Sequence, residues 1–306
     1  MMRERLRRFF SGKARILTLI LILAVLLPVV GDGRRIDYQN ISLGNETQMA
    51  DAIRTAMLHR SYRVRISFTA RTPAQEEVEA IVDRLVELAL AESSDPCGGD
   101  YLRYQYGGYN LAHLMEKEGG RWRYDISIRP VYYTTLKQEQ AVDLQVAEAI
   151  KEMDLPEQAS DIEKIRRVSD FIERRTEYDD VHFRHPGSRH IQSTAYGALI
   201  GRTALCQGYA VLAYRLLKEL GVDNRIVTGT ALVSGEKVRH AWNIVRLNGR
   251  YYNLDITLDD VTGSRRYFLR SDAAFAADHS LDPDFSDRAF REDYPMAKED
   301  YAFNRD

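Results

Sequence analysis

The chain has 306 residues, which is room for about two domains of ~150 residues each. Its 43 Lys and Arg residues and 45 Asp and Glu residues leave a formal net charge of −2, which argues against a general nucleic-acid binder because phosphate binding needs a basic excess. A content of 44% apolar residues, with 18 Tyr, is not that of a disordered chain or of a polytopic membrane protein. The presence of only two cysteines, Cys97 and Cys206, excludes a disulfide scaffold and an all-thiolate zinc site.

The first thirty residues join a basic segment to an apolar one. Residues 1–15 carry a net charge of +5, and in the fifteen residues 16–30 Thr18 is the single polar side chain. Such a run extends about 23 Å as a helix, short of the ~30 Å hydrocarbon core of a bilayer. We interpret residues 1–33 as a secretory signal, either cleaved or kept as a single membrane anchor. The positive-inside rule then places the remainder outside the cytoplasm.

Residues 34–138 mix helical and strand periodicities and are predicted to form a small α+β domain of unknown role. Apolar spacing predicts helices over 46–59 and 76–91 and strands over 62–68 and 123–133. Residues 101–109 are rich in tyrosine and are also predicted as a strand, where aromatic side chains usually pack. Cys97 lies in a turn-rich loop and is interpreted as an unreactive thiol.

A helical region and a histidine-containing loop come next. Helices are predicted over 137–153 and 160–175, the second starting with a Ser160–Glu163 capping box. The loop that follows holds His182, His185 and His190. With no cysteine or rigid helix beside them, we interpret these histidines as part of a solvated or groove-lining loop rather than a zinc site.

Cys206 is predicted to stand at the start of a helix. Apolar residues recur at helical spacing from Val211 to Leu220, and Gly221 ends the pattern. The first turn of a helix has free N–H groups and the positive end of the helix dipole, and both favour a thiolate. Cys206 is therefore a candidate nucleophile, since a structural cysteine would more naturally lie within the apolar stripe.

Residues 239–247 and 250–257 are predicted to form a β-hairpin around Asn248-Gly249, the strongest short hairpin signal. A two-residue type I′ turn pairs Leu247 with Arg250 and places His240 and Asp255 on one face as diagonal neighbours, about 7–8 Å apart at the backbone.

The two faces of this hairpin differ in character. The face of His240 and Asp255 also carries Trp242 and Asn253, whereas the other face is apolar and must be buried. We expect the helix headed by Cys206 to pack on the face with the His–Asp pair. A cysteine, a histidine base and a carboxylate that orients the histidine would together form a nucleophile-plus-base site.

The sequence motifs resemble those of the transglutaminase-like superfamily. The residues that carry the resemblance are AYGAL with the later CQGY, then HAWN, then YYNLDIT, in this order. The resemblance covers about residues 140–280 and implies an α+β fold with a papain-like core, as in secreted or anchored bacterial members. It also implies a triad of Cys206 as nucleophile, His240 as general base and then acid, and Asp255 as the orienter of His240. One departure is Leu258, where members often have Trp.

The chemistry implied is cysteine-dependent acyl transfer on protein or peptide carboxamides, including those of the cell envelope. Gln207, Tyr196 and Trp242 are candidate oxyanion or substrate contacts. A cysteine peptidase or amidase with the same triad is an alternative, because amine and water compete for the same thioester. A non-catalytic envelope-binding module is a second alternative, and an adhesion or glycan-binding role of the N-terminal region is a third.

No cofactor and no metal are expected. Asp259 and Asp260 lack the twelve-residue loop and final Glu of a typical calcium site. The catalytic domain is predicted over residues 139–280, followed by an acidic tail over 281–306 that either straps onto the core or stays loose.

Overall fold

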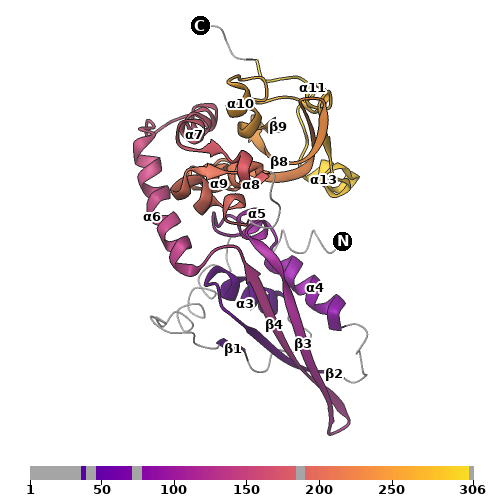
Figure 1. Ribbon diagram of the computed structural model, residues 1–306. Coiled ribbons are helices and arrows are strands. Elements are labelled where there is room, and N and C mark those ends of the chain that lie inside the picture. The colour runs from indigo at the N-terminus through magenta and orange to yellow at the C-terminus, as the bar shows by residue number, and fades with distance from the viewer. Residues whose placement is uncertain (1–35, 39–45, 71–77, 184–189, 303–306) are drawn as a thin grey trace. The chain divides into compact units, whose positions relative to one another are not determined.

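The fold is described by a computed structural model for residues 36–38, 46–70, 78–183 and 190–302 (Figure 1). The predicted signal or anchor, residues 1–33, lies outside the described residues. Within the described part, no helix combines the length and the apolar character needed to cross a membrane. The chain has a mixed α+β fold, which confirms the predicted fold class.

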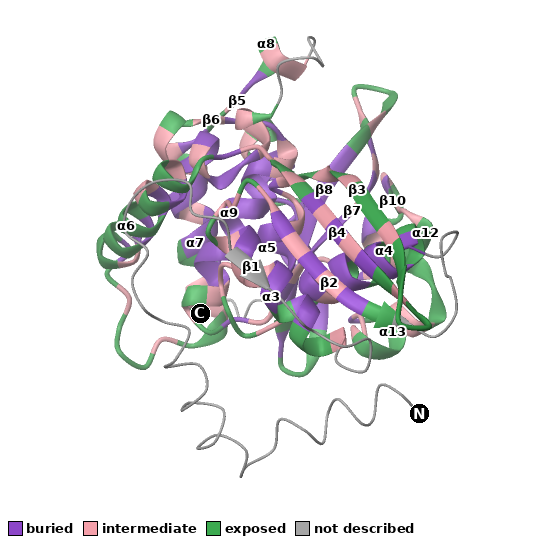
Figure 2. Ribbon diagram, turned by 90° about the horizontal axis from the view of Figure 1, so that it is seen from below, coloured by how far each residue is buried: buried purple, intermediate pink, exposed green. Residues whose placement is uncertain are grey.

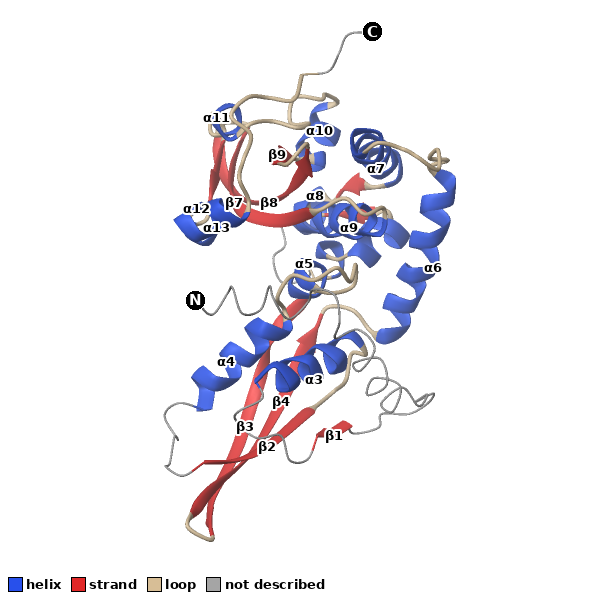
Figure 3. Ribbon diagram, turned by 180° about the vertical axis from the view of Figure 1, so that it is seen from behind, coloured by secondary structure: helices blue, strands red, loops and turns tan. Residues whose placement is uncertain are grey.

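The N-terminal region builds a four-stranded sheet in the order β1-β2-β4-β3, in which β3 and β4 form a long hairpin. The helices α3 and α4 lie on one face of this sheet in two opposite views (Figures 1 and 3). Along β2 and β4, buried residues alternate with more exposed ones (Figure 2), because one face of the sheet packs against the helices. The elements are β1 (Ile36–Tyr38), α3 (Glu46–Leu58), β2 (Val64–Ala70), α4 (Val78–Ala89), α5 (Gly99–Arg103), β3 (Tyr106–Glu118) and β4 (Arg121–Tyr132).

The middle of the chain is mainly helical. The predicted capping box is present: the Ser160 backbone N–H and hydroxyl both donate to Glu163, at 2.7 and 2.6 Å. The elements are α6 (Leu136–Glu152), α7 (Asp161–Arg175), β5 (Glu177–Tyr178), α8 (Asp180–Phe183), η3 (Ile191–Ser193), η4 (Gly197–Gly201), β6 (Thr203–Ala204) and α9 (Cys206–Glu219).

The last third of the chain forms an antiparallel sheet in the order β10-β7-β8-β9. Asn248 and Gly249 both have positive φ, and Leu247 pairs with Arg250, so the predicted type I′ turn and register are confirmed. The elements are β7 (Asn224–Val233), β8 (Glu236–Leu247), β9 (Arg250–Leu254), α10 (Ile256–Thr262), α11 (Asp272–Phe275), β10 (His279–Leu281), α12 (Pro283–Ser286) and α13 (Arg288–Asp293).

The predicted strand over residues 101–109 is wrong in its first half. Gly99–Arg103 is the short helix α5, and strand β3 begins only at Tyr106. Tyr101 is buried and its hydroxyl donates to Glu139 at 2.8 Å. Five residues do not form a stable helix alone, so contacts with distant parts of the chain hold this turn, and local pattern does not report them.

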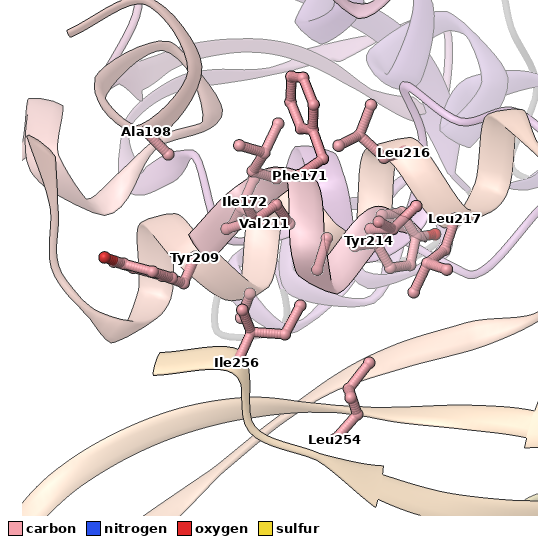
Figure 4. Close-up of a cluster of buried hydrophobic side chains, with 14 of the residues drawn as sticks. Phe171, Ile172, Ala198, Tyr209, Val211, Tyr214, Leu216, Leu217, Leu254 and Ile256 are labelled. Atoms are coloured by element: carbon pink, nitrogen blue, oxygen red, sulfur yellow. The ribbon is translucent and has the colours of Figure 1, made fainter. Parts of the chain in front are cut away.

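The side of the hairpin that receives α9 is also opposite to the one predicted. The helix packs on the apolar face, where Val211 and its neighbours share one buried cluster with Val245, Leu254 and Ile256. Figure 4 shows Leu254 and Ile256 directed toward this helix. An apolar strand face gains most from burial against an apolar helix, and that gain decides the side on which α9 lies.

The face of the sheet that carries His240 is buried by the C-terminal segment. Trp242 and Ile244 share a second cluster with Phe275, and Phe290 and Met296 pack against it. The described part of the acidic tail is therefore a strap on the core, one of the two arrangements that the sequence left open.

A buried ion pair ties α5 to β7. The Asp100 carboxylate, 1% exposed, accepts hydrogen bonds from the Arg225 guanidinium at 2.7 and 3.0 Å and from the Ile226 backbone N–H at 2.7 Å. We predict that Asp100→Ala lowers the free energy of unfolding in urea by about 3 kcal/mol, because it leaves a buried guanidinium without its main partner. Glu87→Ala, which breaks an exposed pair with Arg103, should cost less than about 1 kcal/mol. Equal losses in the two variants would contradict this prediction.

Candidate active site

Cys206 is the first residue of α9, as predicted, with Leu205 as the N-cap. The backbone N–H of Leu205 donates to the Gln192 carbonyl at 2.9 Å and fixes the entry into the helix. Gly208 lies so close to this segment that a Cβ would stand 2.4 Å from the Gln192 oxygen. The CQGY sequence thus needs its glycine so that the loop can pack against the first helical turn.

His240 and Asp255 meet through a short hydrogen bond. The Nε2 atom of His240, in β8, lies 2.7 Å from Oδ2 of Asp255. Asp255 is fully buried, and its Oδ1 accepts the backbone N–H of Leu258 at 3.1 Å. The carboxylate is therefore fixed at both oxygens, and it fixes the imidazole in turn.

Asp255 reaches this position by a different backbone path from the one predicted. Strand β9 ends at Leu254 and does not continue to Thr257; Asp255 is the N-cap of helix α10. Its backbone N–H donates to the Tyr267 carbonyl at 3.1 Å. An Asp side chain favours the N-cap because it accepts an N–H of the first turn, and this local preference ends the strand before the predicted diagonal pair can form.

The sulfur of Cys206 contacts both the His240 side chain and the backbone N–H of Ala241. Because Nε2 of His240 is bonded to Asp255, Nδ1 is the ring nitrogen left to face the thiol. The start of α9 thus reaches strand β8 even though the helix packs on the opposite face. The structure brings together the three residues of the predicted triad.

The charges of these three groups shift one another's pKa values toward the ionised forms. Burial alone would raise the pKa of the Cys206 thiol, but the charge and hydrogen bond of His240 outweigh it, so the pKa is lowered. Burial opposes the protonated ring of His240, yet the Asp255 carboxylate and the Cys206 thiolate raise its pKa well above the usual value. Burial likewise would raise the pKa of Asp255, and the two histidines near it lower the pKa instead. A thiolate–imidazolium pair follows from these directions.

Cys206 also remains accessible. Its exposure is intermediate, whereas His240 and Asp255 are buried. Cys97 has similar exposure, but burial of its thiol raises the pKa to about 12 and keeps it protonated near neutral pH.

The three further residues predicted as oxyanion or substrate contacts have other partners. The side-chain amide of Gln207 donates to the carbonyls of Tyr104 and Ser193, at 2.6 and 3.2 Å. Trp242 is 2% exposed and its indole N–H donates to Asn253 at 2.9 Å. Tyr196 is half-buried and packs against the main core. Packing and hydrogen bonds within the fold therefore account for these side chains, and the backbone N–H groups at the start of α9 are left as candidate oxyanion donors.

Sequence reasoning missed His279. Its Nε2 lies 3.2 Å from Oδ2 of Asp255, and its Nδ1 lies 2.8 Å from Oδ1 of Asp278. The residue reaches the site because β10 pairs with β7, with His279 opposite Ala231. No local motif marks it; only this pairing between distant strands brings it to the triad.

His240, Asp255 and His279 form the one group in the described ranges whose donor atoms could hold a metal ion, with all three atoms within 4.8 Å of one another. Imidazole and carboxylate are donors that zinc accepts. A metal there would displace the protons that now connect both rings to Asp255, and it would prevent His240 from working as an acid. Metal binding and the triad chemistry exclude each other at this place.

The predicted histidine loop gives no comparable cluster among its described residues. His182 Nδ1 pairs with Asp179 at 2.8 Å, and the His190 ring stacks on Tyr133 with centroids 4.8 Å apart. His185 lies outside the described residues.

Residues 147–256 match the family model of the transglutaminase-like superfamily, which confirms the resemblance over this segment. Similar solved structures include a TGase, with 15% identity over 64% of this chain and 51% of the other and a TM-score of 0.37. Another is a candidate cysteine protease from Cytophaga hutchinsonii, with 17% identity over 50% of this chain and 65% of the other and a TM-score of 0.31. A third is a candidate protease from Parabacteroides distasonis, with 11% identity over 63% of this chain and 39% of the other and a TM-score of 0.28. The chain spans about half the length of the first of these. A search of the curated proteins finds no match.

Thiol alkylation tests the ion pair directly. We predict that Cys206 reacts with iodoacetamide with an inflection below pH ~8.5, the value of a free cysteine. His240→Gln should move this inflection upward because the thiolate loses its cation. Cys206→Ser leaves Cys97 as an internal control, which should react slowly up to high pH. An inflection in the wild type that does not change in His240→Gln would contradict the ion pair.

A second acid close to the site, Asp259, has an unusual environment. Its side chain is 1% exposed, Oδ1 accepts the Tyr267 N–H at 2.8 Å, and Oδ2 is buried without a partner. Burial raises its pKa to about 7. The folded protein therefore keeps a proton that the unfolded chain releases near pH ~4, so folding stability falls as the pH rises between these two values.

We predict that Asp259→Asn, a neutral replacement, stabilises the protein relative to the wild type by on the order of 1 kcal/mol more at pH 8 than at pH 5. Urea unfolding of both proteins at the two pH values measures this difference. A gain that is the same at pH 5 and pH 8 would show that the acid does not hold its proton in the fold.

Proposed function

We propose that this protein is a cysteine-dependent acyl-transfer enzyme that acts on carboxamide or peptide carbonyl groups. The observation that carries the proposal is the hydrogen-bonded series of Cys206, His240 and Asp255, with Cys206 at a helix N-terminus and partly exposed. The match of residues 147–256 to a superfamily of cysteine enzymes supports the same reaction class.

In the first half of the reaction, the Cys206 thiolate attacks the carbonyl carbon, and the oxygen becomes an oxyanion. Backbone N–H groups at the start of α9 stabilise this charge, because the first turn of a helix has no internal acceptors for them. The proton on His240 Nδ1 passes to the leaving nitrogen, the C–N bond breaks, and ammonia or an amine departs. A thioester on Cys206 remains.

In the second half, an amine or water attacks the thioester. Neutral His240 takes the proton of the attacking group, the C–S bond breaks, and Cys206 leaves as the thiolate, which restores the ion pair. Asp255 keeps Nε2 of the ring protonated throughout, so that Nδ1 is always the atom that exchanges the proton. An amine gives a new amide bond, and water gives a carboxylic acid.

Whether an amine or water attacks the thioester is decided by measuring the products of both reactions with the full chain. A glutamine-containing peptide is incubated with a fluorescent primary amine, and amine incorporation, ammonia release and peptide cleavage are followed together. We expect Cys206→Ala to lose at least about 10³-fold in every product that forms, as removal of a nucleophile does. Cys97→Ser is the matched control and should keep its activity. If Cys206→Ala retains the wild-type rate, the proposal is wrong.

We further propose that the protein acts outside the cytoplasm, on secreted or cell-envelope proteins. The support is the basic and apolar pattern of residues 1–30. Fusion of residues 1–40 to a reporter that is active only after export tests this. Replacement of Leu21 and Leu23 by Arg should abolish the reporter signal, and a signal that persists would argue against export by this segment.

A further inference from the structure

His279 lies next to the triad, although the chemistry of the three triad residues does not require a second histidine. The side chain is 1% exposed and contacts the triad through Asp255. It stacks on Phe275 with ring centroids 3.8 Å apart, and its ring lies edge-on to Trp242 and Tyr267. These aromatic rings pack closely around the imidazole and restrict its rotation.

Both nitrogens of His279 face carboxylates. Nε2 lies 3.2 Å from Asp255 and Nδ1 lies 2.8 Å from Asp278. A neutral imidazole has one N–H and one lone pair, so it can donate to only one carboxylate and would present a lone pair to the other. With both carboxylates ionised, both contacts are hydrogen bonds only when both nitrogens carry a proton, that is, when the ring is a cation.

The charges around His279 alternate in sign from the surface to the sulfur. Asp278 also accepts from the Tyr267 hydroxyl at 3.1 Å and from the exposed Arg266 guanidinium at 3.2 Å. The imidazolium of His279 then separates the Asp278 and Asp255 carboxylates, and Asp255 separates the rings of His279 and His240, whose centroids are 5.7 Å apart. Opposite charges in contact compensate for part of the cost of burying each of them.

We propose that His279 is a positioning residue of the active site: as a buried cation between Asp278 and Asp255, it holds the Asp255 carboxylate ionised and directed at His240. This role rests on the proposed function, because it acts through Asp255 and His240 on the reactivity of Cys206. Oδ2 of Asp255 accepts from both rings, so the direction of this oxygen depends on His279 as well as on His240.

The proposal has a consequence for pH dependence that packing alone does not have. A cation at His279 disfavours the protonated form of His240 and favours the thiolate of Cys206. Removal of this cation acts on both groups in one direction: the His240 proton is lost at higher pH, and the thiolate of Cys206 forms at higher pH.

The test uses the pH profile of Cys206 alkylation in the full chain, with Cys97→Ser as the common background. In His279→Gln, an amide replaces the cation and can still donate to Asp255. The profile has two inflections, one where the Cys206 thiolate forms and one where His240 loses its proton. We expect both to move upward by at least about half a pH unit, and kcat/KM for the acyl-transfer reaction to fall about tenfold. His182→Gln is the matched control, since His182 also pairs with an aspartate but stands in α8, and its profile should equal that of the background.

A second variant keeps the test decisive if His279→Gln does not fold. Asp278→Asn removes the outer carboxylate from a more accessible position, with the side chain 14% exposed, and should shift both inflections in the same direction by a smaller amount. A loss of rate or stability in folded His279→Gln with both inflections unmoved would overturn the proposal, because that is the result of a packing role alone. Alkylation needs no turnover, so a shifted profile without activity would support His279 while contradicting the proposed function.

Discussion

The site depends on the burial of one carboxylate, that of Asp255, with all its charge compensated by hydrogen bonds. It has no exposed surface, and an isolated ion there would cost several kcal/mol. The backbone N–H of Leu258 bonds one oxygen, and His240 and His279 bond the other. Because these donors come from a helix start and from two strands, the carboxylate can stay ionised while buried only when those elements are assembled together.

This constraint explains why the histidine is a strong partner for the thiol. The carboxylate raises the pKa of His240, and the resulting cation lowers the pKa of Cys206. Each group compensates for the burial of the next one. The lowered pKa of the Cys206 thiol therefore results from this series of charges and not from the helix dipole alone. The first turn of α9 adds its N–H groups and its positive end to that series.

Two buried clusters pack against opposite faces of the sheet and thereby decide which side chains of the site can contact one another. Helix α9 lies on the face of Val245 and Leu254, while the C-terminal strap covers the face of Trp242. Cys206 can contact His240 only because its helix begins at the sheet, beside the backbone of Ala241. Strand β10, which leads into this strap, carries His279 to the rear of Asp255.

The features that the sequence alone determined are those with a local physical cause. Asn248-Gly249 determined the turn and register of the hairpin, and the apolar spacing after Cys206 determined a helix that starts at the sulfur, because turn geometry and helical period are properties of neighbouring residues. The tertiary structure decided the rest: the face on which α9 packs, the helical turn at Tyr101 and the presence of His279 beside Asp255. Each of these depends on burial or hydrogen bonds between residues far apart in the chain, and no local pattern encodes such contacts.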